Sequence, residues 1–308
     1  MREQTIVQPG RWIGFAFIAA ALVAVGMICA PETAQAKVVN KTVWNSTSIA
    51  QWQSSTRAFS SKTLTTKDYN IVGSKKADTI KLHVGPKGMF SISVNGKRKV
   101  RFNANCGPDL TASMKYMKMK NGRTFLYVTC TGDNADGLYA VYEGKKNGKL
   151  VKVASPSDIP RACLAGHNYL DTAWVKGNTL KVRYLPMILA TGQVHLTYDF
   201  KYSKKAGHVV RTANTTKRVA VGYSKPYVKT LHPRGKLKLY TSAKANKKKT
   251  TVKAGTSLSI TKACLKGGPK GHNVTFKVKT KKGVTGWFKG TQEYSDYYTL
   301  FKETYLAG

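Results

Sequence analysis

The chain has 308 residues, which is enough for one large domain or two of ordinary size. Hydrophobic residues make up 42% of the chain and aromatic residues 10%, so it can form a packed core, and wholesale disorder is excluded. Its 52 Lys and Arg residues face only 14 Asp and Glu residues, which gives a formal net charge of +38. Such a charge is unusual for an enzyme with a neutral substrate and points to a negatively charged partner.

The first 36 residues have the three parts of a secretory signal peptide. A polar, basic start precedes residues 12–30, which contain no charged residue, and the segment closes with Ala34 and Ala36. Small residues at these two positions satisfy the rule for signal peptidase, so we expect cleavage before Lys37. The alternative is an uncleaved membrane anchor, because about 19 apolar residues are long enough to cross a bilayer.

After cleavage the mature chain would keep four cysteines. An even number in an exported protein is compatible with disulfides, and four cysteines allow three pairings. Free thiols are the alternative if the exporting cell is a bacterium without strong oxidative folding machinery. The cysteines concerned are Cys106, Cys130, Cys163 and Cys264.

Strand patterns dominate the mature chain. Residues 194–202 alternate between apolar and polar side chains, so that five apolar residues share one face. Asn-Gly pairs at 95–96, 121–122 and 147–148 predict hairpins, because a type I′ turn needs two residues that accept positive φ. After residue 37 no window of about a dozen residues keeps a helical apolar stripe. We therefore predict an all-β protein.

The chain also contains a weak internal repeat. The segments that begin at Cys106 and Cys163 resemble each other, and each continues into a second hairpin, while residues 89–105 look like the closing hairpin of a weaker, earlier unit. We predict about three related β-meander units over residues 41–218. Three units are too few to close a propeller, so a sandwich-like arrangement is the first expectation and a partial propeller the second.

The strand pattern loosens before the last quarter of the chain. Pro226 and Pro233 lie close together in a stretch with little alternation, which is typical of a linker. We predict a repeated β-meander domain over residues 37–218, a linker over residues 219–235 and a second domain over residues 236–308.

The second domain has the features of a small barrel. A short first strand ends at Tyr240, a Lys-Ala-Gly-Thr turn occupies residues 253–256, and a late hairpin closes on Gly286 and Trp287. Over residues 236–290 this arrangement resembles a bacterial SH3-like (SH3b) domain. The resemblance implies a barrel with Trp287 in its core and a role in binding cell walls. The residues after Tyr240 depart from the pattern of that family, so ligand contacts of this loop are not carried over.

The candidate binding residues are lysines and tyrosines of this second domain. The lysine run at residues 244–249 is the best anion contact in the sequence, although a solvated loop would look the same. The tyrosine-rich tail is either a stacking surface for sugar rings or a segment laid across the barrel, since aromatic residues often close small cores. The candidates are Tyr240, Lys247, Lys248, Lys249, Tyr294, Tyr297 and Tyr298.

No catalytic, metal or cofactor site is predicted. Cys163, His167 and Asp171 have helical spacing for a cysteine peptidase, but Gly166 interrupts the segment, and the related segment at Cys106 has no histidine. The few carboxylates do not form a pair suited to a glycosidase, and the histidines are scattered singly rather than clustered as metal ligands.

The positive charge is spread over the whole mature chain. Residues 37–218 carry a net charge of +22 and residues 219–308 carry +16, and lysine supplies 41 of the 52 basic residues. Lysine is a hydrated point charge without the planar fork of arginine. This composition favours diffuse attraction to a polyanion over the recognition of particular bases, so nucleic acid is not the expected partner.

These observations predict an exported, non-catalytic binding protein at the bacterial cell surface. Its expected partners are peptidoglycan or teichoic-acid-like anionic polymers, with peripheral contact to anionic membranes. The alternative is a wall-modifying hydrolase with an unrecognised site in residues 37–218. A third alternative is a secreted nucleic-acid scavenger, which the small number of arginines and the lack of base-stacking signatures disfavour. The charge could also serve only solubility.

Overall fold

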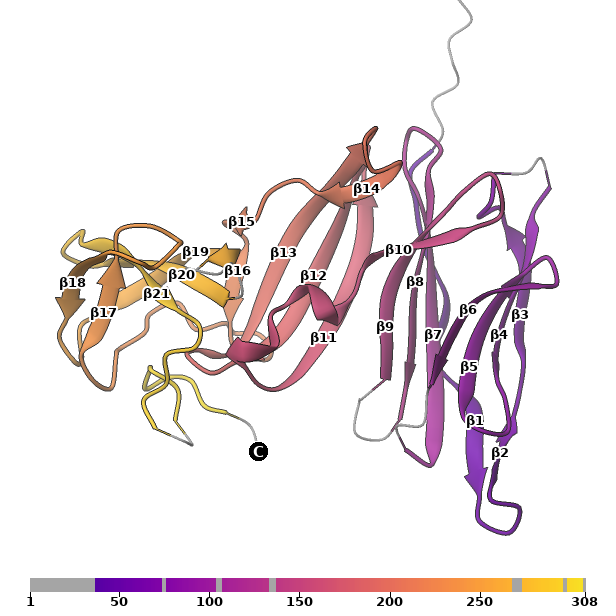
Figure 1. The fold of residues 1–308 in the computed structure, drawn as a ribbon, viewed down its shortest axis with the longest axis horizontal. Helices are drawn as coiled ribbons and strands as arrows, with labels where there is room; N and C mark the ends of the chain where they lie inside the picture. Colours follow the sequence, from indigo (N-terminus) through magenta and orange to yellow (C-terminus); the bar gives the residue numbers. More distant parts are fainter. Residues whose placement is uncertain are drawn as a thin grey trace, which may run out of the picture. The chain divides into compact units, whose positions relative to one another are not determined.

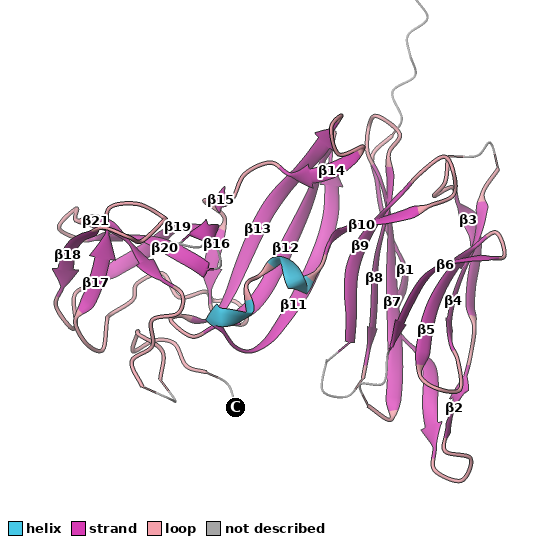
Figure 2. Cartoon of the chain, in the orientation of Figure 1, coloured by secondary structure: helices cyan, strands magenta, loops and turns pink. Residues whose placement is uncertain are grey.

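The computed structural model describes residues 37–73, 76–103, 107–132, 137–267, 273–295 and 298–306. The predicted signal peptide, Cys106 and Tyr297 lie outside these residues. Within them the protein is all-β, as predicted, with four antiparallel sheets, two short 3₁₀ turns and no α-helix (Figure 1, Figure 2). None of the described helical segments has the length and apolar character needed to cross a membrane.

The first half of the described chain forms two sheets, which we call sheets A and B. Sheet A has the strand order β10-β9-β8-β7-β1-β2, and sheet B has the order β3-β4-β5-β6. In sheet A the strands are β1 (Val39–Gln53), β2 (Ala58–Ser61), β7 (Asp109–Lys118), β8 (Thr124–Thr131), β9 (Gly137–Gly144) and β10 (Leu150–Ala154). In sheet B they are β3 (Leu64–Tyr69), β4 (Asp78–Val84), β5 (Met89–Val94) and β6 (Lys97–Asn103).

The second half forms sheets C and D. Sheet C has the order β11-β12-β13-β14, with β16 also paired to β13, and sheet D has the order β15-β19-β20-β21-β17-β18. In sheet C the strands are β11 (Leu164–Lys176), β12 (Thr179–Ile188), β13 (Gly192–Ser203), β14 (His208–Arg211) and β16 (Val219–Val221), preceded by the 3₁₀ turns η1 (Pro156–Asp158) and η2 (Arg161–Cys163). In sheet D they are β15 (Thr215–Thr216), β17 (Leu237–Tyr240), β18 (Lys248–Val252), β19 (Leu258–Gly267), β20 (Asn273–Thr280) and β21 (Thr285–Lys289).

Three successive runs of four strands are up-and-down meanders: β3 to β6, β7 to β10 and β11 to β14. The predicted hairpin at Asn95-Gly96 is confirmed, because these residues have φ of 51° and 77° and join β5 to β6. Gly122 and Gly148 also have positive φ and lie in the β7–β8 and β9–β10 turns, which confirms the other two hairpins.

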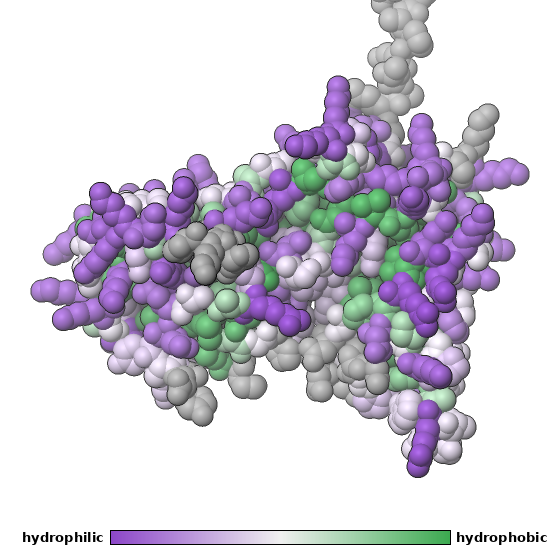
Figure 3. Space-filling view, viewed as in Figure 1, coloured by the Kyte–Doolittle hydropathy of each residue, from purple (hydrophilic) through white to green (hydrophobic). Residues whose placement is uncertain are grey.

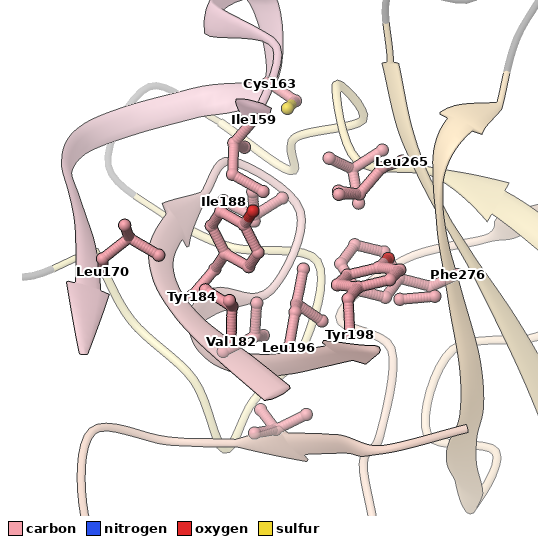
Figure 4. Packing of buried hydrophobic residues seen from close by; sticks show 14 of the residues in the cluster. Ile159, Cys163, Leu170, Val182, Tyr184, Ile188, Leu196, Tyr198, Leu265 and Phe276 are labelled. Carbon is pink, nitrogen blue, oxygen red and sulfur yellow. The ribbon is translucent and has the colours of Figure 1, made fainter. Parts of the chain in front are cut away.

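The central strands of sheet A, β8 and β9, are buried on both faces. Leu126 and Val128 of β8 belong to a core that sheet A shares with sheet B, whereas Phe125 of the same strand belongs to a second core. This second core also contains residues of sheets C and D. Figure 4 shows Tyr184 and Tyr198 of sheet C packed in the same interior as Leu265 and Phe276 of sheet D. Sheets A, C and D therefore share one continuous hydrophobic core.

Asn40 covers one position of a strand edge between sheets A and C. Its side-chain Nδ2 donates to the Val175 carbonyl at 2.9 Å, and its Oδ1 accepts from the Val175 N–H at 2.7 Å. Val175 lies on β11, the edge strand of sheet C. The side chain of Asn40 thus satisfies a backbone donor and a backbone acceptor that a neighbouring strand would otherwise pair.

The residues on either side of the predicted domain boundary at residue 218 pair with both sheet C and sheet D. The short strand β15 pairs with β19 of sheet D, and β16 pairs with β13 of sheet C. Thr216 Oγ1 also donates to the Thr197 carbonyl at 2.6 Å. The chain therefore passes from sheet C to sheet D through residues held by regular hydrogen bonds.

Candidate binding face of sheet D

Sheet D has one apolar face and one polar face. In β20, Phe276 and Val278 are buried, while Lys277 is partly exposed and Lys279 is exposed. Successive side chains of a strand point to opposite faces, so the lysines lie on the face opposite the core. The sequence of β20 alternates for this reason, unlike that of the doubly buried β8.

A single row of five side chains crosses this polar face. Cross-strand pairs join Lys248 to Tyr240, Tyr240 to Trp287, Trp287 to Lys277 and Lys277 to Lys262. Residues that lie directly opposite each other share a face, with Cβ atoms about 5 Å apart. We call these five residues the aromatic–lysine row. Two aromatic rings occupy its centre, with a lysine on one side and two on the other.

Further lysines border the two rings. Lys289 lies two residues after Trp287, and its Nζ is 5.3 Å from the centroid of the Tyr240 ring. Lys249 Nζ donates to the Thr285 carbonyl at 2.8 Å, which fixes this lysine at the rim. An ammonium close to an aromatic face is stabilised by the ring quadrupole, so the rings and the lysines form one surface.

The loop over residues 241–247 is anchored against the same sheet. The Thr275 hydroxyl of β20 donates to the Ala243 carbonyl at 3.1 Å, and Ala245 is fully buried with a φ of 50°. The Thr241 N–H donates to the Lys247 carbonyl at 3.0 Å, which closes the loop. Lys247 is therefore presented from an ordered loop beside Tyr240.

The row faces no described counter-charge. Among the carboxylates that the structure describes, none lies within ion-pair distance of a lysine of the row. Residues 219–308 contain only three acidic residues in all. The aromatic–lysine row therefore presents uncompensated positive charge around two aromatic rings, which suits a ligand with both anionic groups and apolar ring faces.

The structure corrects the predicted role of Trp287. This residue is only partly buried and lies in the row, whereas Phe288 is fully buried in the core. Phe288 stacks on Phe276 at 5.3 Å and meets Phe301 edge-on at 5.6 Å. A shift of one residue along a strand exchanges the two faces, which is why the neighbour of Trp287 fills the core instead.

Close packing against β17 requires a glycine at position 286 of the Gly-Trp pair. A Cβ atom at this position would lie 2.8 Å from Leu239 Cβ, closer than side chains pack. Glycine therefore permits the close approach of β17 and β21 that places Tyr240 beside Trp287.

The other sequence candidates fall into two groups. Tyr240 and Lys248 belong to the row, and Lys247 and Lys249 lie at its rim. Tyr294 and Tyr298 belong to the tail, where they are 54% and 51% exposed, and their backbones are paired to each other. The Arg234 guanidinium lies 5.1 Å from the Tyr298 ring centroid.

Sequence reasoning missed Lys262, Lys277 and Lys289 as site residues. Lys277 alternates with Phe276 and Val278 in the sequence, which indicates an exposed face. The strand order, which the sequence does not reveal, places this face beside Tyr240 and Trp287.

Cys163 is not placed to act as a nucleophile. Cys163 is fully buried, its thiol lies 2.9 Å from the Pro160 carbonyl, and burial raises its pKa to about 11. Cys163 and Cys264 are free thiols in the structure, and Cys130 is buried. Asp171, which has the spacing of a third peptidase residue, instead forms an ion pair with Arg183. The side chain of His167 lies outside the described residues.

Within the described ranges, no group of three or more His, Cys, Asp or Glu side chains is placed to hold a metal ion. Comparison with known proteins found no matching family model, no matching curated protein and no matching solved structure.

Proposed function

We propose that this protein binds anionic saccharide polymers of the bacterial cell envelope through the aromatic–lysine row. The observation that carries the proposal is the alignment of Tyr240 and Trp287 between lysines on the solvent face of sheet D. Aromatic faces pack against the apolar faces of sugar rings, and lysines attract phosphate or carboxylate groups as point charges. Peptidoglycan and teichoic-acid-like polymers offer both features.

The charge of the whole chain supports the same partner. The regions before and after residue 218 are both strongly basic, so a polyanion is attracted before it reaches the row. On the face that Figure 3 presents, long hydrophilic side chains project over sheet D and over sheets A and B alike. This distribution also favours peripheral contact with an anionic membrane surface, as a weaker and less specific interaction.

The resemblance to SH3-like domains belongs to this proposal. Sheet D contains the short first strand β17, the loop that follows it and the late hairpin from β20 to β21 that ends at Gly286-Trp287. Residues 236–290 are proposed as an SH3-like barrel, and residues 37–218 as a sandwich of three related meanders. The signal-like sequence over residues 1–36 supports export to the cell surface or the medium.

The experiment is retention of the mature chain on purified cell walls, with and without teichoic acid, across a salt series. Retention is expected to fall steeply as salt rises, because the interaction is electrostatic. Equal retention at low and high salt would contradict the proposal.

A matched pair of variants separates the row from diffuse charge. Lys262→Gln with Lys277→Gln removes two charges from the row, and Lys204→Gln with Lys205→Gln removes two from the exposed β13–β14 turn. The first pair is expected to reduce retention at least about tenfold more than the second, the effect of about 1.4 kcal/mol. An equal loss in both pairs would show that the row is not the binding site.

A further inference from the structure

Three polar side chains from distant parts of the chain form a hydrogen-bonded line. Ser257 lies directly before β19, His232 lies between β16 and β17, and Glu303 lies in the tail. His232 Nε2 is 2.9 Å from Ser257 Oγ, and His232 Nδ1 is 2.6 Å from Glu303 Oε1. Both distances are those of real hydrogen bonds. The order is hydroxyl, imidazole, carboxylate.

The carboxylate determines the tautomer of the imidazole. Burial alone would raise the pKa of Glu303, but the hydrogen bonds from the His232 ring and backbone outweigh this effect and lower it, so the group is ionised at neutral pH. An ionised carboxylate only accepts hydrogen bonds, so His232 Nδ1 is the donor. In neutral His232 the Nε2 atom then carries no proton, so it accepts a hydrogen bond from the Ser257 hydroxyl.

The backbone holds this arrangement in place. The second carboxylate oxygen of Glu303 accepts from the His232 N–H at 2.8 Å, so both carboxylate oxygens engage the same histidine. The Lys302 N–H donates to the His232 carbonyl at 3.0 Å. The imidazole is therefore fixed in orientation by its acid, as a general base requires.

The hydroxyl end of the line lies at a surface hollow, where Ser257 is half-buried. Ser257 lines a surface hollow of about 440 Å³ between β18 and the β20–β21 turn, and Lys281 and Lys282 line the same hollow. The side chains of His232 and Glu303 are 34% and 28% exposed. The hollow gives a substrate a route to Ser257, and the two lysines that line it supply positive charge to a substrate with anionic groups.

We infer that Ser257, His232 and Glu303 form a nucleophilic site that hydrolyses carboxylic esters, with substrates that carry negative charge favoured by the lysines of the hollow. In the first step Ser257 Oγ bonds to the acyl carbon, the ester C–O bond breaks, and the Ser257 proton passes through His232 Nε2 to the leaving alcohol. In the second step water attacks the acyl carbon and His232 takes its proton. The bond between the acyl carbon and Ser257 Oγ breaks, His232 returns the proton to Ser257 Oγ, and the carboxylic acid is released.

This activity goes beyond the binding function and is independent of it, because no residue of the aromatic–lysine row takes part. Ser257 and His232 act as catalytic residues here, whereas Glu303 positions the histidine. A purely structural line of hydrogen bonds that ties the tail to sheet D is the alternative outcome of the test.

The test uses the mature chain with a fluorophosphonate probe, followed by peptide mapping, and with p-nitrophenyl acetate as substrate. One label per chain is expected on Ser257, and Ser257→Ala is expected to abolish both labelling and hydrolysis. Ser259→Ala is the matched control, because Ser259 lies two residues away in β19 and has no bond to the histidine. It should behave as wild type.

Variants of the other two residues test their roles. His232→Gln is expected to lower the labelling rate at least about 100-fold. Glu303→Gln is expected to lower kcat for the ester with little change in KM, which a structural tie alone would not produce. An unlabelled Ser257, or hydrolysis by Ser257→Ala equal to that of the wild type, would overturn the inference.

Discussion

Sheets A and D use their second faces in opposite ways. Sheet A packs one face on sheet B and the other on the core shared with sheets C and D, so successive residues of β8 such as Phe125 and Leu126 are both fully buried. Sheet D packs one face and leaves the other to lysines and two aromatic rings. Binding residues are therefore expected on strands in which buried apolar and exposed polar side chains alternate, because only such strands present a face to solvent.

Sheet A also shows how a charge is accommodated when no open face is available. Glu143 of β9 is fully buried, and its carboxylate accepts from Arg123 at 2.7 Å, from Lys145 at 2.6 Å and from the Val209 N–H at 2.8 Å. All three partners are groups of the protein itself. The Arg123 guanidinium also lies 3.5 Å from the Tyr202 ring centroid. This charge joins sheets A and C, whereas the charges of the row remain available to a ligand.

The largest expected effect separates two neighbours in β21. Phe288→Ala is expected to lower the free energy of unfolding by about 4 kcal/mol, because it empties part of the core. Trp287→Ala is expected to lower it by only about 1 kcal/mol while it weakens retention on cell walls. Urea denaturation of both variants measures the difference. Equal destabilisation would show that sheet D has no distinct solvent face.

Substitution of Glu143, the buried acid of sheet A, should reduce stability nearly as much. Glu143→Ala is expected to lower the free energy of unfolding by about 3 kcal/mol, since it leaves Arg123, Lys145 and the Val209 N–H without their acceptor. Glu293→Ala, in the tail, is the control and should change stability by less than about 0.5 kcal/mol. Similar values for the two variants would contradict the structural role of Glu143.

The thiol of Cys163 should be nearly inert in the folded protein. Its pKa is raised from 9.0 to about 11, so the thiolate fraction at neutral pH is about 100-fold below that of an ordinary cysteine. A thiol-reactive chromophore is expected to modify Cys163 only after the addition of denaturant. Rapid modification of Cys163 in the native protein would contradict this prediction and make the cysteine a candidate nucleophile again.

The smallest effect concerns Asp199 on β13. Burial alone would raise its pKa, but hydrogen bonds from Lys181 and Arg218 outweigh this effect and lower it. A lowered pKa stabilises the fold above the unfolded-state value near 3.8, and this contribution is lost as pH falls through the folded-state pKa. Asp199→Asn is expected to cost about 0.5 kcal/mol at pH 7, because the pair is partly exposed.

The measurement for Asp199 is the melting temperature of wild type and variant at pH 7 and in strong acid. The difference between the two proteins should shrink in strong acid, where Asp199 is protonated in the wild type as well. A difference that grows on acidification would reverse the sign of the predicted contribution.

Local patterns in the sequence predicted the local structure of this protein well. The Asn-Gly pairs predicted the hairpins, and alternation predicted an all-β fold, because both depend on the conformational needs of a few adjacent residues. Trp287 was assigned to the core from a resemblance, and the pleat of β21 places Phe288 there instead. Tyr240 and Lys248 were candidates, but their alignment with Trp287 and Lys277 required the strand order.

The line of Ser257, His232 and Glu303 could not be predicted from spacing. His232 and Glu303 are 71 positions apart, and Ser257 lies 25 positions after the histidine. A single histidine in a stretch without regular alternation carries no signal of its own. Only the return of the tail to the start of sheet D brings the three side chains together.

The pairing of Asn40 with Val175 has a consequence for the behaviour of the protein at high concentration. An uncovered strand edge recruits strands of other molecules, which leads to aggregation and fibril growth. On β11 the side chain of Asn40 occupies that edge at Val175. Loss of the segment that carries Asn40, for example by proteolysis, should therefore promote self-association.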